Sequence, residues 1–285
     1  MPATGQLEAN KQLVLHFFRE VITLRTADAA GKFVTADYRQ HAPDIADGPG
    51  AMEEHARQIS GGPERDLVAA ELLTPVFMVA EDDLVTTCFY MPQPEPGDPG
   101  KTYDYFTFST YRVRGGKIAE CWPNTHKYAP LHQPPDPAVG RDRATQPGHV
   151  GAPDLKANKR LVRDFYARVF GAMDPGAIRD FAAGDYHQHA SHMPQGRSGL
   201  EEYVAAIAGS APRAAGPAPA ASLPEPDVLL AEGDIVIIAA CLPQPEPDGS
   251  GASWPYYAYD AYRVKDGKLT EHWSGINKAA PPWHG

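Results

Sequence analysis

Apolar residues recur at helical spacing near the start of the chain and again just past its middle. In the segment 10–21 and its immediate extension they are Leu13, Val14, Phe17, Phe18, Val21 and Ile22. In the segment 158–169 and its extension they are Leu161, Val162, Phe165, Tyr166, Val169 and Phe170. Steps of three and four residues place each set on one helical face. The pattern therefore predicts two long amphipathic helices.

Each predicted helix is followed by the same series of shorter elements. "DYRQH" (37–41) reads as a short strand and "GPGAMEEHARQI" (48–59) as a further helix. In the second half of the chain a short helix is predicted to begin with Asp174 as its cap and Pro175 at its first position. Strand-like runs come next, and "RGGK" and "KDGK" are typical of tight hairpin turns. Three helices followed by a curled, mostly antiparallel sheet make an α+β layout.

These similar series reflect a duplication of the whole chain. "DYRQHA" at 37–42 matches "DYHQHA" at 185–190, and "YRVRGGKIAECW" at 111–122 matches "YRVKDGKLTEHW" at 262–273. Such a repeat of supersecondary units indicates repeated domains. We predict copy one at 1–133, a Pro/Gly-rich linker at 134–154, and copy two at 155–285. A second Pro-rich segment, 210–227, is predicted to be a loop.

A proline-rich pentapeptide, "PQPEP", is repeated as well, at 92–96 and at 243–247. Proline lacks an N–H and fixes φ, so the pentapeptide cannot lie inside a helix or a central strand. We expect it to form a long hairpin loop between two strands of each copy. Loops at the mouth of a sheet often border a pocket.

Composition narrows the class of protein. The net charge of −10 argues against nucleic acid or an anionic membrane as the main partner. No apolar run reaches the roughly 18 residues of a membrane span, and the first residues lack the features of a signal peptide. Three cysteines without a CxxC pattern favour a reduced, cytoplasmic protein. We expect a protein that acts on a small molecule.

The motifs "DYxQH", "AEGDIV" and "YRVxxGKxxEHW" together resemble the SnoaL-like polyketide cyclases. These belong to the superfamily of nuclear transport factor 2 and ketosteroid isomerase, and the resemblance covers both copies. It implies two tandem cone-shaped α+β barrels related by a pseudo-two-fold axis, each with an apolar pocket. It also implies an internal pseudo-dimer and leaves a further homodimer open. The cyclases need no cofactor: a carboxylate or histidine removes a proton beside a carbonyl, and a donor steadies the enolate.

The resemblance suggests four catalytic candidates. His41 and His189 lie where the related isomerases carry their general base, and they would point into the pocket. Asp260 lies where those isomerases carry an Asp that donates to the oxyanion, while copy one has Ser109 there. His126 lies four positions after Trp122, where many cyclases have an acidic residue, and Asn277 is its counterpart. Structural alternatives stay open: a backbone-bonded histidine, an aspartate paired with Arg263, and a surface His126.

Substrate-binding candidates surround these positions. The strand before the last is rich in aromatic residues, which suits a planar oxygenated ligand or, alternatively, core packing. The candidates are Tyr105, Ser109, Trp122, Tyr256, Trp273 and Asn277. "HQHASH" holds His187, His189 and His192, but copy one keeps only His41 and no carboxylate lies at a ligand spacing. We therefore predict no metal site.

The favoured function is a cofactor-free cyclase or isomerase that acts on an apolar, oxygenated, polyketide-like intermediate. One rival is an epoxide hydrolase of the polyether type, which would need paired carboxylates, with Asp37, Asp104 or Asp185 as substitutes for the missing ones. Another is a binding protein without a catalytic base. The copies differ at Ser109 and Asp260, Cys121 and His272, and His126 and Asn277. This divergence suggests that one copy is catalytic and the other is not.

Overall fold

The computed structural model describes residues 4–23, 29–58, 74–128, 143–148, 154–210 and 225–278. Contacts divide the chain into two compact units. Unit 1 comprises Met1–Gln146, Cys241–Ala258 and Asn277–Gly285, and unit 2 comprises Pro147–Ala240 and Tyr259–Ile276. Two segments of the predicted copy two, Cys241–Ala258 and Asn277–Gly285, are thus grouped with copy one. The linker 134–154 and the loop 210–227 lie mostly outside the described residues.

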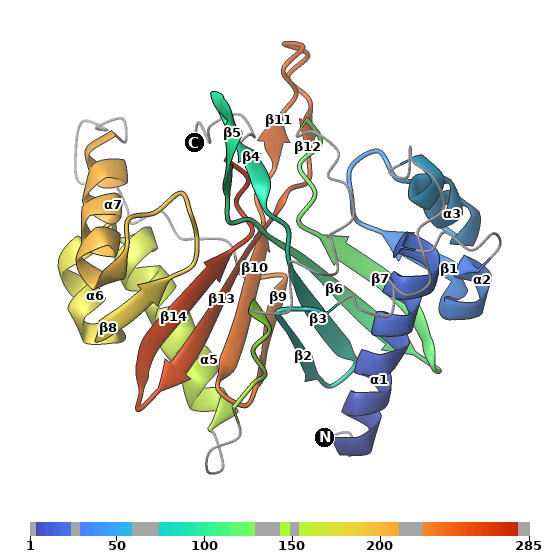
Figure 1. The fold of residues 1–285 in the computed structure, drawn as a ribbon, viewed down its shortest axis with the longest axis horizontal. Coiled ribbons are helices and arrows are strands. Elements are labelled where there is room, and N and C mark those ends of the chain that lie inside the picture. Colours follow the sequence, from blue (N-terminus) through green and yellow to red (C-terminus); the bar gives the residue numbers. More distant parts are fainter. Residues whose placement is uncertain are drawn as a thin grey trace. The chain divides into compact units, whose positions relative to one another are not determined.

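Copy one folds as helices against a five-stranded sheet (Figure 1). Its helical segments are α1 (Thr4–Phe17), a π-helical continuation (Phe18–Thr23), α2 (Ala30–Phe33) and α3 (Pro49–Gln58). The strands are β1 (Val34–Gln40), β2 (Phe77–Glu81), β3 (Leu84–Tyr90), β6 (Phe106–Arg114) and β7 (Lys117–Pro123). Their order is β1-β7-β6-β3-β2, and the β1–β7 pair is parallel while the others are antiparallel.

Copy two repeats this topology. Its helical segments are α5 (Leu155–Phe165), a π-helical continuation (Tyr166–Gly171), a 3₁₀ turn (Pro175–Ala177), α6 (Ile178–Phe181) and α7 (Gly196–Ser210). Its strands are β8 (Ala182–Gln188), β9 (Val228–Glu232), β10 (Ile235–Cys241), β13 (Tyr257–Lys265) and β14 (Lys268–Ser274). They lie in the order β8-β14-β13-β10-β9, which corresponds strand for strand to copy one. The predicted mixed α+β class is confirmed.

Local signals behaved as predicted at the helix cap and the hairpin turns. The Asp174 side chain accepts hydrogen bonds from the N–H groups of Gly176 and Ala177, which caps the turn that starts at Pro175. The β13–β14 turn holds Asp266 and Gly267 at φ of 50° and 70°. Positive φ at both central positions gives the backbone twist that joins antiparallel strands.

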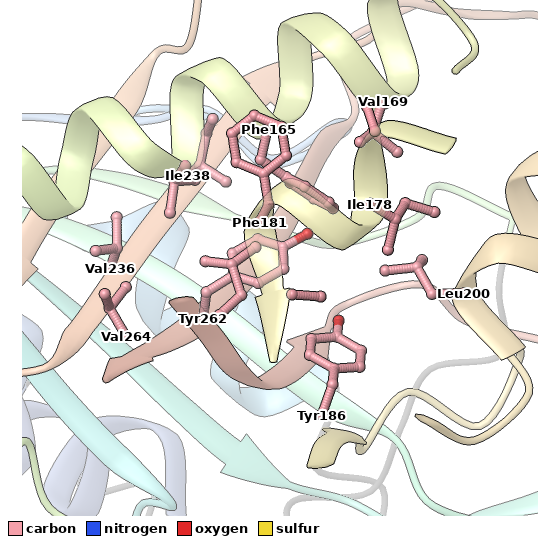
Figure 2. Close-up of a cluster of buried hydrophobic side chains, with 14 of the residues drawn as sticks. Phe165, Val169, Ile178, Phe181, Tyr186, Leu200, Val236, Ile238, Tyr262 and Val264 are labelled. Atoms are coloured by element: carbon pink, nitrogen blue, oxygen red, sulfur yellow. The ribbon is translucent and has the colours of Figure 1, made fainter. Parts of the chain in front are cut away.

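The core of unit 2 lies between its helices and one side of the sheet. Figure 2 shows side chains from α5, α6 and α7 meeting those of the strands, with Phe165 near the centre. The sheet contributes Tyr186, Val236, Ile238, Tyr262 and Val264 to this cluster. Because side chains alternate along a strand, Ala261 and Arg263 belong to the opposite side. We call these the helix-facing side and the outer side of the sheet.

We predicted that the pentapeptides form long loops. Instead, each pentapeptide contributes one strand to a short two-stranded ribbon. Gln93–Glu95 (β4) pairs with Asp98–Tyr103 (β5), and Gln244–Pro245 (β11) pairs with Ser253–Trp254 (β12). Proline is tolerated there because a two-stranded ribbon leaves one edge of each strand without a partner.

Both ribbons belong to unit 1, and each provides a glutamate for an ion pair. Glu246 of the second pentapeptide pairs with Lys127 at 2.6 Å, and Glu95 of the first pairs with Lys278. Lys127 and Lys278 each follow the last strand of the opposite copy. The repeated glutamate thus forms an ion pair between each ribbon and the segment that follows the last strand of the other copy.

Candidate functional site

His41 and His189 lie flat against tryptophan rings. His41 stacks on Trp122 with centroids 4.8 Å apart, and His189 stacks on Trp273 at 4.5 Å, both within 6° of parallel. Trp273 is paired with Ala261, which is on the outer side of the sheet. The His189 ring therefore lies on the outer side of its sheet, stacked on Trp273, whereas we expected it to point into an apolar pocket. The reason is that β14 turns His272, and not Trp273, toward the core.

Charged residues complete the arrangement on the outer side of unit 2. The Nε2 atom of His189 lies 2.9 Å from Glu271, and Glu271 accepts a hydrogen bond of 2.6 Å from Arg263. Arg263 also pairs with Asp234 at 2.7 Å, so the alternative partner that we considered for Asp260 is engaged elsewhere. Burial lowers the pKa of His189, and the hydrogen bond from His189 lowers that of Glu271.

These two shifts predict that acid destabilises the protein. A histidine whose pKa is lowered on folding binds fewer protons than in the unfolded chain, so stability is lost as pH falls below about 6.5. The lowered pKa of Glu271 removes further stability below its ordinary value of about 4.5. His189→Gln should flatten the dependence of the unfolding free energy on pH between 5 and 7, measured by urea denaturation. An unchanged slope, equal to that of a His187→Gln control, would contradict this.

The remaining histidine candidate, His126, lies in unit 1 among aromatic residues of β12 and its continuation. Its ring meets the edges of Trp254 at 4.8 Å and Tyr256 at 5.6 Å, and Nδ1 accepts a hydrogen bond from the N–H of Tyr128. Burial lowers the pKa of His126. His126 of copy one and Tyr256 of copy two were named as separate candidates, and the structure brings their rings together in unit 1.

Asn277 and Tyr105 also meet in unit 1. Asn277 is buried and accepts a 2.8 Å hydrogen bond from the hydroxyl of Tyr103, which packs beside Tyr105 and Met91. Burial raises the pKa of Tyr105. Ser109 lies in β6 opposite Thr87 and Pro123 and is not among these residues. The candidates of unit 1 therefore form separate small clusters.

Asp260 is the one candidate that lies on the helix-facing side of unit 2. It precedes Tyr262 by two residues on β13, so both side chains emerge from the same side. The Tyr166 hydroxyl donates a hydrogen bond to its Oδ2, and Nε2 of His272 lies 2.9 Å from its Oδ1. The Asp260 side chain is 20% exposed and that of His272 only 1%. Tyr262 stacks on the His272 ring at 4.6 Å.

The negative charge of Asp260 influences a group of buried tyrosines. Burial, and next the charge of Asp260, raises the pKa of Tyr166, Tyr186 and Tyr203 above its ordinary value near 10. Tyr262 is shifted in the same direction by burial, with Tyr166 and Asp260 as further causes. These phenols therefore stay protonated and can donate hydrogen bonds at neutral pH. The site combines one carboxylate, one imidazole and several hydroxyl donors in an apolar setting.

Copy one lacks this chemistry at the corresponding positions. Phe18, Ser109 and Cys121 take the places of Tyr166, Asp260 and His272. Phe18 stacks on Phe89 at 4.4 Å, and burial raises the pKa of Cys121 to about 12. A neutral thiol and a phenyl ring cannot hold a buried carboxylate. The copies therefore differ at all three positions of this network.

A further difference concerns the tyrosine of the "DYxQH" motif. In copy one the Gln40 amide donates a 3.1 Å hydrogen bond to the hydroxyl of Tyr38. In copy two the Gln188 amide lies 3.2 Å from the sulfur of Met193. Gln188 interacts only weakly with the buried Tyr186 hydroxyl: burial raises the pKa of Tyr186 and Gln188 partly opposes that shift, but the hydroxyl makes no hydrogen bond of good geometry within the described residues. Leaving such a group unpaired costs about 1–3 kcal/mol.

This contrast predicts opposite effects of the same substitution. Tyr38→Phe should destabilise the protein by about 1 kcal/mol, because it leaves the half-buried Gln40 donor without its acceptor. Tyr186→Phe should be neutral or stabilising by up to about 1 kcal/mol, because it removes an unpaired hydroxyl. Urea unfolding of the two variants beside the parent chain measures both. Equal losses from both substitutions would mean that Tyr186 is already satisfied.

Other features of the described residues do not point to a competing site. Two surface hollows of about 430 and 420 Å³ lie against Asn10 and Asp83 and against Arg179 and Glu201, away from Asp260. Among the described residues no group of three His, Cys, Asp or Glu side chains is placed to hold a metal ion. None of the helices in this part of the chain is long and apolar enough to cross a membrane.

Comparison with known families gives a match within copy two. Residues 162–272 match the model of the SnoaL-like domain. That stretch lies in copy two and includes Tyr166, Tyr186, Asp260 and His272. The match concerns this part of the chain, and no curated protein matches the sequence.

Several solved structures are similar over about two fifths of the chain. TsrD from Streptomyces laurentii is 17% identical over 43% of this chain and 89% of its own, with a TM-score of 0.31. NTF2-like proteins from Burkholderia xenovorans and Burkholderia pseudomallei are 18% and 14% identical. They cover 42% of this chain each and 88% and 91% of their own, both with a TM-score of 0.31.

Sequence reasoning missed three members of the Asp260 network. Tyr166 was counted only as an apolar helix position, and Tyr186 only as part of a strand motif. His272 was noted as diverged from Cys121 but was not connected to Asp260. The available signal was the pairwise divergence of Phe18, Ser109 and Cys121 from their counterparts, taken as a set. Their proximity depends on the pairing of β13 with β14, which no local pattern encodes.

Proposed function

We propose that copy two is a cofactor-independent catalyst of proton transfer that cyclises or isomerises a small apolar carbonyl compound. The observation that carries the proposal is the Asp260 carboxylate, held between Tyr166 and His272 in an aromatic core. Its location within the SnoaL-like stretch supports the same class of reaction. Perturbed titratable groups in apolar surroundings are typical of catalytic sites.

The chemistry assigns one role to each group. The Asp260 carboxylate removes a proton from the carbon beside a carbonyl, and the electron pair moves to the carbonyl oxygen. The Tyr186 hydroxyl donates a hydrogen bond to the resulting enolate oxygen. Asp260 then returns the proton to another carbon, which completes an isomerisation. Alternatively the enolate carbon attacks a second carbonyl of the same molecule, and that oxygen takes the proton, which completes a cyclisation.

Tyr166 and His272 hold the base in place. Each occupies one oxygen of the Asp260 carboxylate, so the group cannot rotate freely. Orientation of a reacting group is a large part of catalytic efficiency. The proposal needs no cofactor, because every proton and electron pair stays within the substrate and the side chains.

The proposal assigns copy one a structural or ligand-holding role. Its strand order supports a second domain of the same fold, and its Ser109 and Cys121 cannot act as a base of comparable strength. We also propose that the two copies form an internal pseudo-dimer, packed sheet against sheet. The reciprocal ion pairs of Glu95 and Glu246 support this. Small-angle scattering of the full chain should then give one compact particle; two particles on a tether would contradict it.

The epoxide-hydrolase alternative requires a second carboxylate, and the described hydrogen-bond partners of Asp260 are Tyr166 and His272. Asp37 is exposed and bonded to Arg114 at 2.6 Å, and Asp104 pairs with Arg143. Asp185 is exposed on β8. Each of the three is therefore exposed or paired with an arginine, so we do not adopt this alternative.

Exchange of carbon-bound protons tests the proposed function. The ketone 1-tetralone is flat and apolar, and its CH₂ group beside the carbonyl exchanges in D₂O once a base removes a proton. The full chain should accelerate loss of that proton signal in NMR spectra well beyond an equal concentration of acetate. Binding without exchange would favour a non-catalytic binding protein. Neither binding nor exchange would contradict the proposal.

A further inference from the structure

The surface hollow of about 430 Å³ in unit 1 lies where the first helix meets two hairpin turns of the sheet. Gln6 and Asn10 of α1 line it, together with Asp82 and Asp83 of the β2–β3 turn and with Val113 and Gly115 at the β6–β7 turn. Asn10 is only 4% exposed although it is polar, and its Oδ1 accepts a 2.9 Å hydrogen bond from Gln6. The proposed function uses none of these residues.

The hollow carries an excess of negative charge. Asp83 is neutralised by Arg112, whose Nη1 lies 2.8 Å from its Oδ2. Asp82 is exposed, and no ion pair to it is found among the described residues. The amide oxygens of Gln6 and Asn10 are further acceptors. The lining is therefore suited to a ligand that donates hydrogen bonds.

Copy two shows what this position of the fold can receive. Asp234 corresponds to Asp83 and pairs in the same way with Arg263, at 2.7 Å. The other oxygen of Asp234 accepts a 2.6 Å hydrogen bond from the backbone N–H of Gly148. A Cβ at position 148 would lie 2.7 Å from the Asp234 carboxylate, so the close approach depends on glycine. An N–H donor thus covers this carboxylate in copy two.

In copy one the same carboxylate is more open. The Asp83 side chain is 47% exposed and that of Asp234 is 26% exposed. The copies also differ in charge, because Asp82 stands where copy two has Gly233. One carboxylate neutralised by an arginine matches the neutral N–H of Gly148. The same pair with an additional carboxylate matches an N–H donor that carries a positive charge.

We propose that the hollow of copy one binds the primary ammonium group of a small alkylamine. An ammonium group has three N–H donors and no acceptor, and the free oxygen of Asp83, the Asp82 carboxylate and an amide oxygen of the hollow supply three acceptors. Val113 provides an apolar surface for the alkyl stem. The net charge of −10 favours the approach of cations to the protein.

Three matched probes test the need for both charge and N–H donors: n-butylammonium, butyltrimethylammonium and 1-butanol. The second has the charge and the stem but no N–H group, and the third has a donor but no charge. Each is titrated into the full chain at pH 7 and constant ionic strength, and the amide NMR signals of Gly115 and Gly116 are followed. n-Butylammonium should bind about fivefold more tightly than the other two, which is the upper range for an exposed ion pair.

A pair of variants separates local contact from overall charge. Asp82→Asn should weaken the binding of n-butylammonium about fivefold, and asparagine tolerates the φ of 53° at this position. Asp266→Asn is the control: Asp266 is exposed in the β13–β14 turn, has a φ of 50°, and its substitution changes the net charge equally. It should leave the affinity within about twofold. Circular dichroism establishes that both variants are folded.

Equal affinity for n-butylammonium and butyltrimethylammonium would overturn the proposal, because charge alone would then explain the binding. Equal weakening by Asp82→Asn and Asp266→Asn would overturn it as well, and so would a titration in which the signals of Gly115 and Gly116 do not saturate. The hollow contains neither Asp260 nor its hydrogen-bond partners. Failure of amine binding therefore leaves the proposed function standing, and a failure of proton exchange leaves the amine site standing.

Discussion

Asp260→Asn should lower the rate of proton exchange from 1-tetralone by about 10²–10⁴-fold, which is the usual contribution of a general base. The amide has nearly the shape of the carboxylate and can still accept from Tyr166, so the site should keep its geometry. It cannot take up a proton. The loss should therefore appear in the exchange rate, while the affinity for the ketone changes little. NMR exchange rates and calorimetric affinities measure the two quantities separately.

The matched control lies in copy one. Ser109 corresponds to Asp260, and Ser109→Ala should leave the exchange rate within about twofold, because proton transfer by copy one is not part of the proposed mechanism. Similar losses from both variants would contradict the division of labour between the copies. An Asp260→Asn variant with full activity would remove Asp260 from the mechanism.

Phe165→Ala should destabilise the protein by about 3–5 kcal/mol, the usual cost of removing a fully buried aromatic ring. Phe165 has no exposed surface and belongs to the cluster in Figure 2, where it projects from α5. Its ring packs edge-on against those of Phe170, Phe181 and Tyr262 at 5.5–5.8 Å. Its removal leaves a cavity that the surrounding helices and sheet can only partly close.

Chemical denaturation followed by tryptophan fluorescence and by circular dichroism measures this loss. Phe165→Leu is the control, and it should cost roughly half as much or less because most of the buried volume is kept. The equivalent change in copy one, Phe17→Ala, should have a similar cost, since Phe17 is 1% exposed and meets Phe33 and Tyr111 in the same manner. A loss below about 1 kcal/mol for Phe165→Ala would show that the cluster does not hold the fold together.

The long helices and the hairpins were predictable from the chain because their signals are local. The spacing of Val162, Phe165 and Val169 defines a helical face, and Asp174 with Pro175 defines a helix start. Both depend on residues that are close in sequence. The repeat strengthened these predictions, because each helix or strand assigned in one copy also had to fit the matching segment of the other copy.

The candidate site was predictable only in part. Asp260 was named on the resemblance, and the structure places it beside the core of unit 2, bonded to Tyr166 and His272. His41 and His189 were named on the same grounds, yet they stack on the outer side of their sheets. A histidine that follows a strand can face either side, and the choice depends on which neighbouring side chain offers a surface. Here that surface is Trp122 in one copy and Trp273 in the other.

The pentapeptides also show that a local sequence predicts backbone conformation but not distant contacts. Their prolines excluded helices and central strands, as the chemistry of proline requires. Nothing in "PQPEP" indicated that Glu95 and Glu246 would pair with Lys278 and Lys127, which are more than a hundred residues away. Such pairs form because the fold brings distant segments together, and the short motif carries only one of the two charges.

The sequence by itself determined the duplication, the α+β class and the identity of the residues that differ between the copies, because these depend on composition and on spacing along one chain. The tertiary structure decided which of those residues act together. Pairing of β13 with β14 places Asp260 beside His272, and packing of α5 and its π-helical continuation on the sheet brings Tyr166 to the same carboxylate. The physical reason is that strand register and the side of the sheet are properties of the whole assembly: a shift by one residue would send each of these side chains to the opposite side.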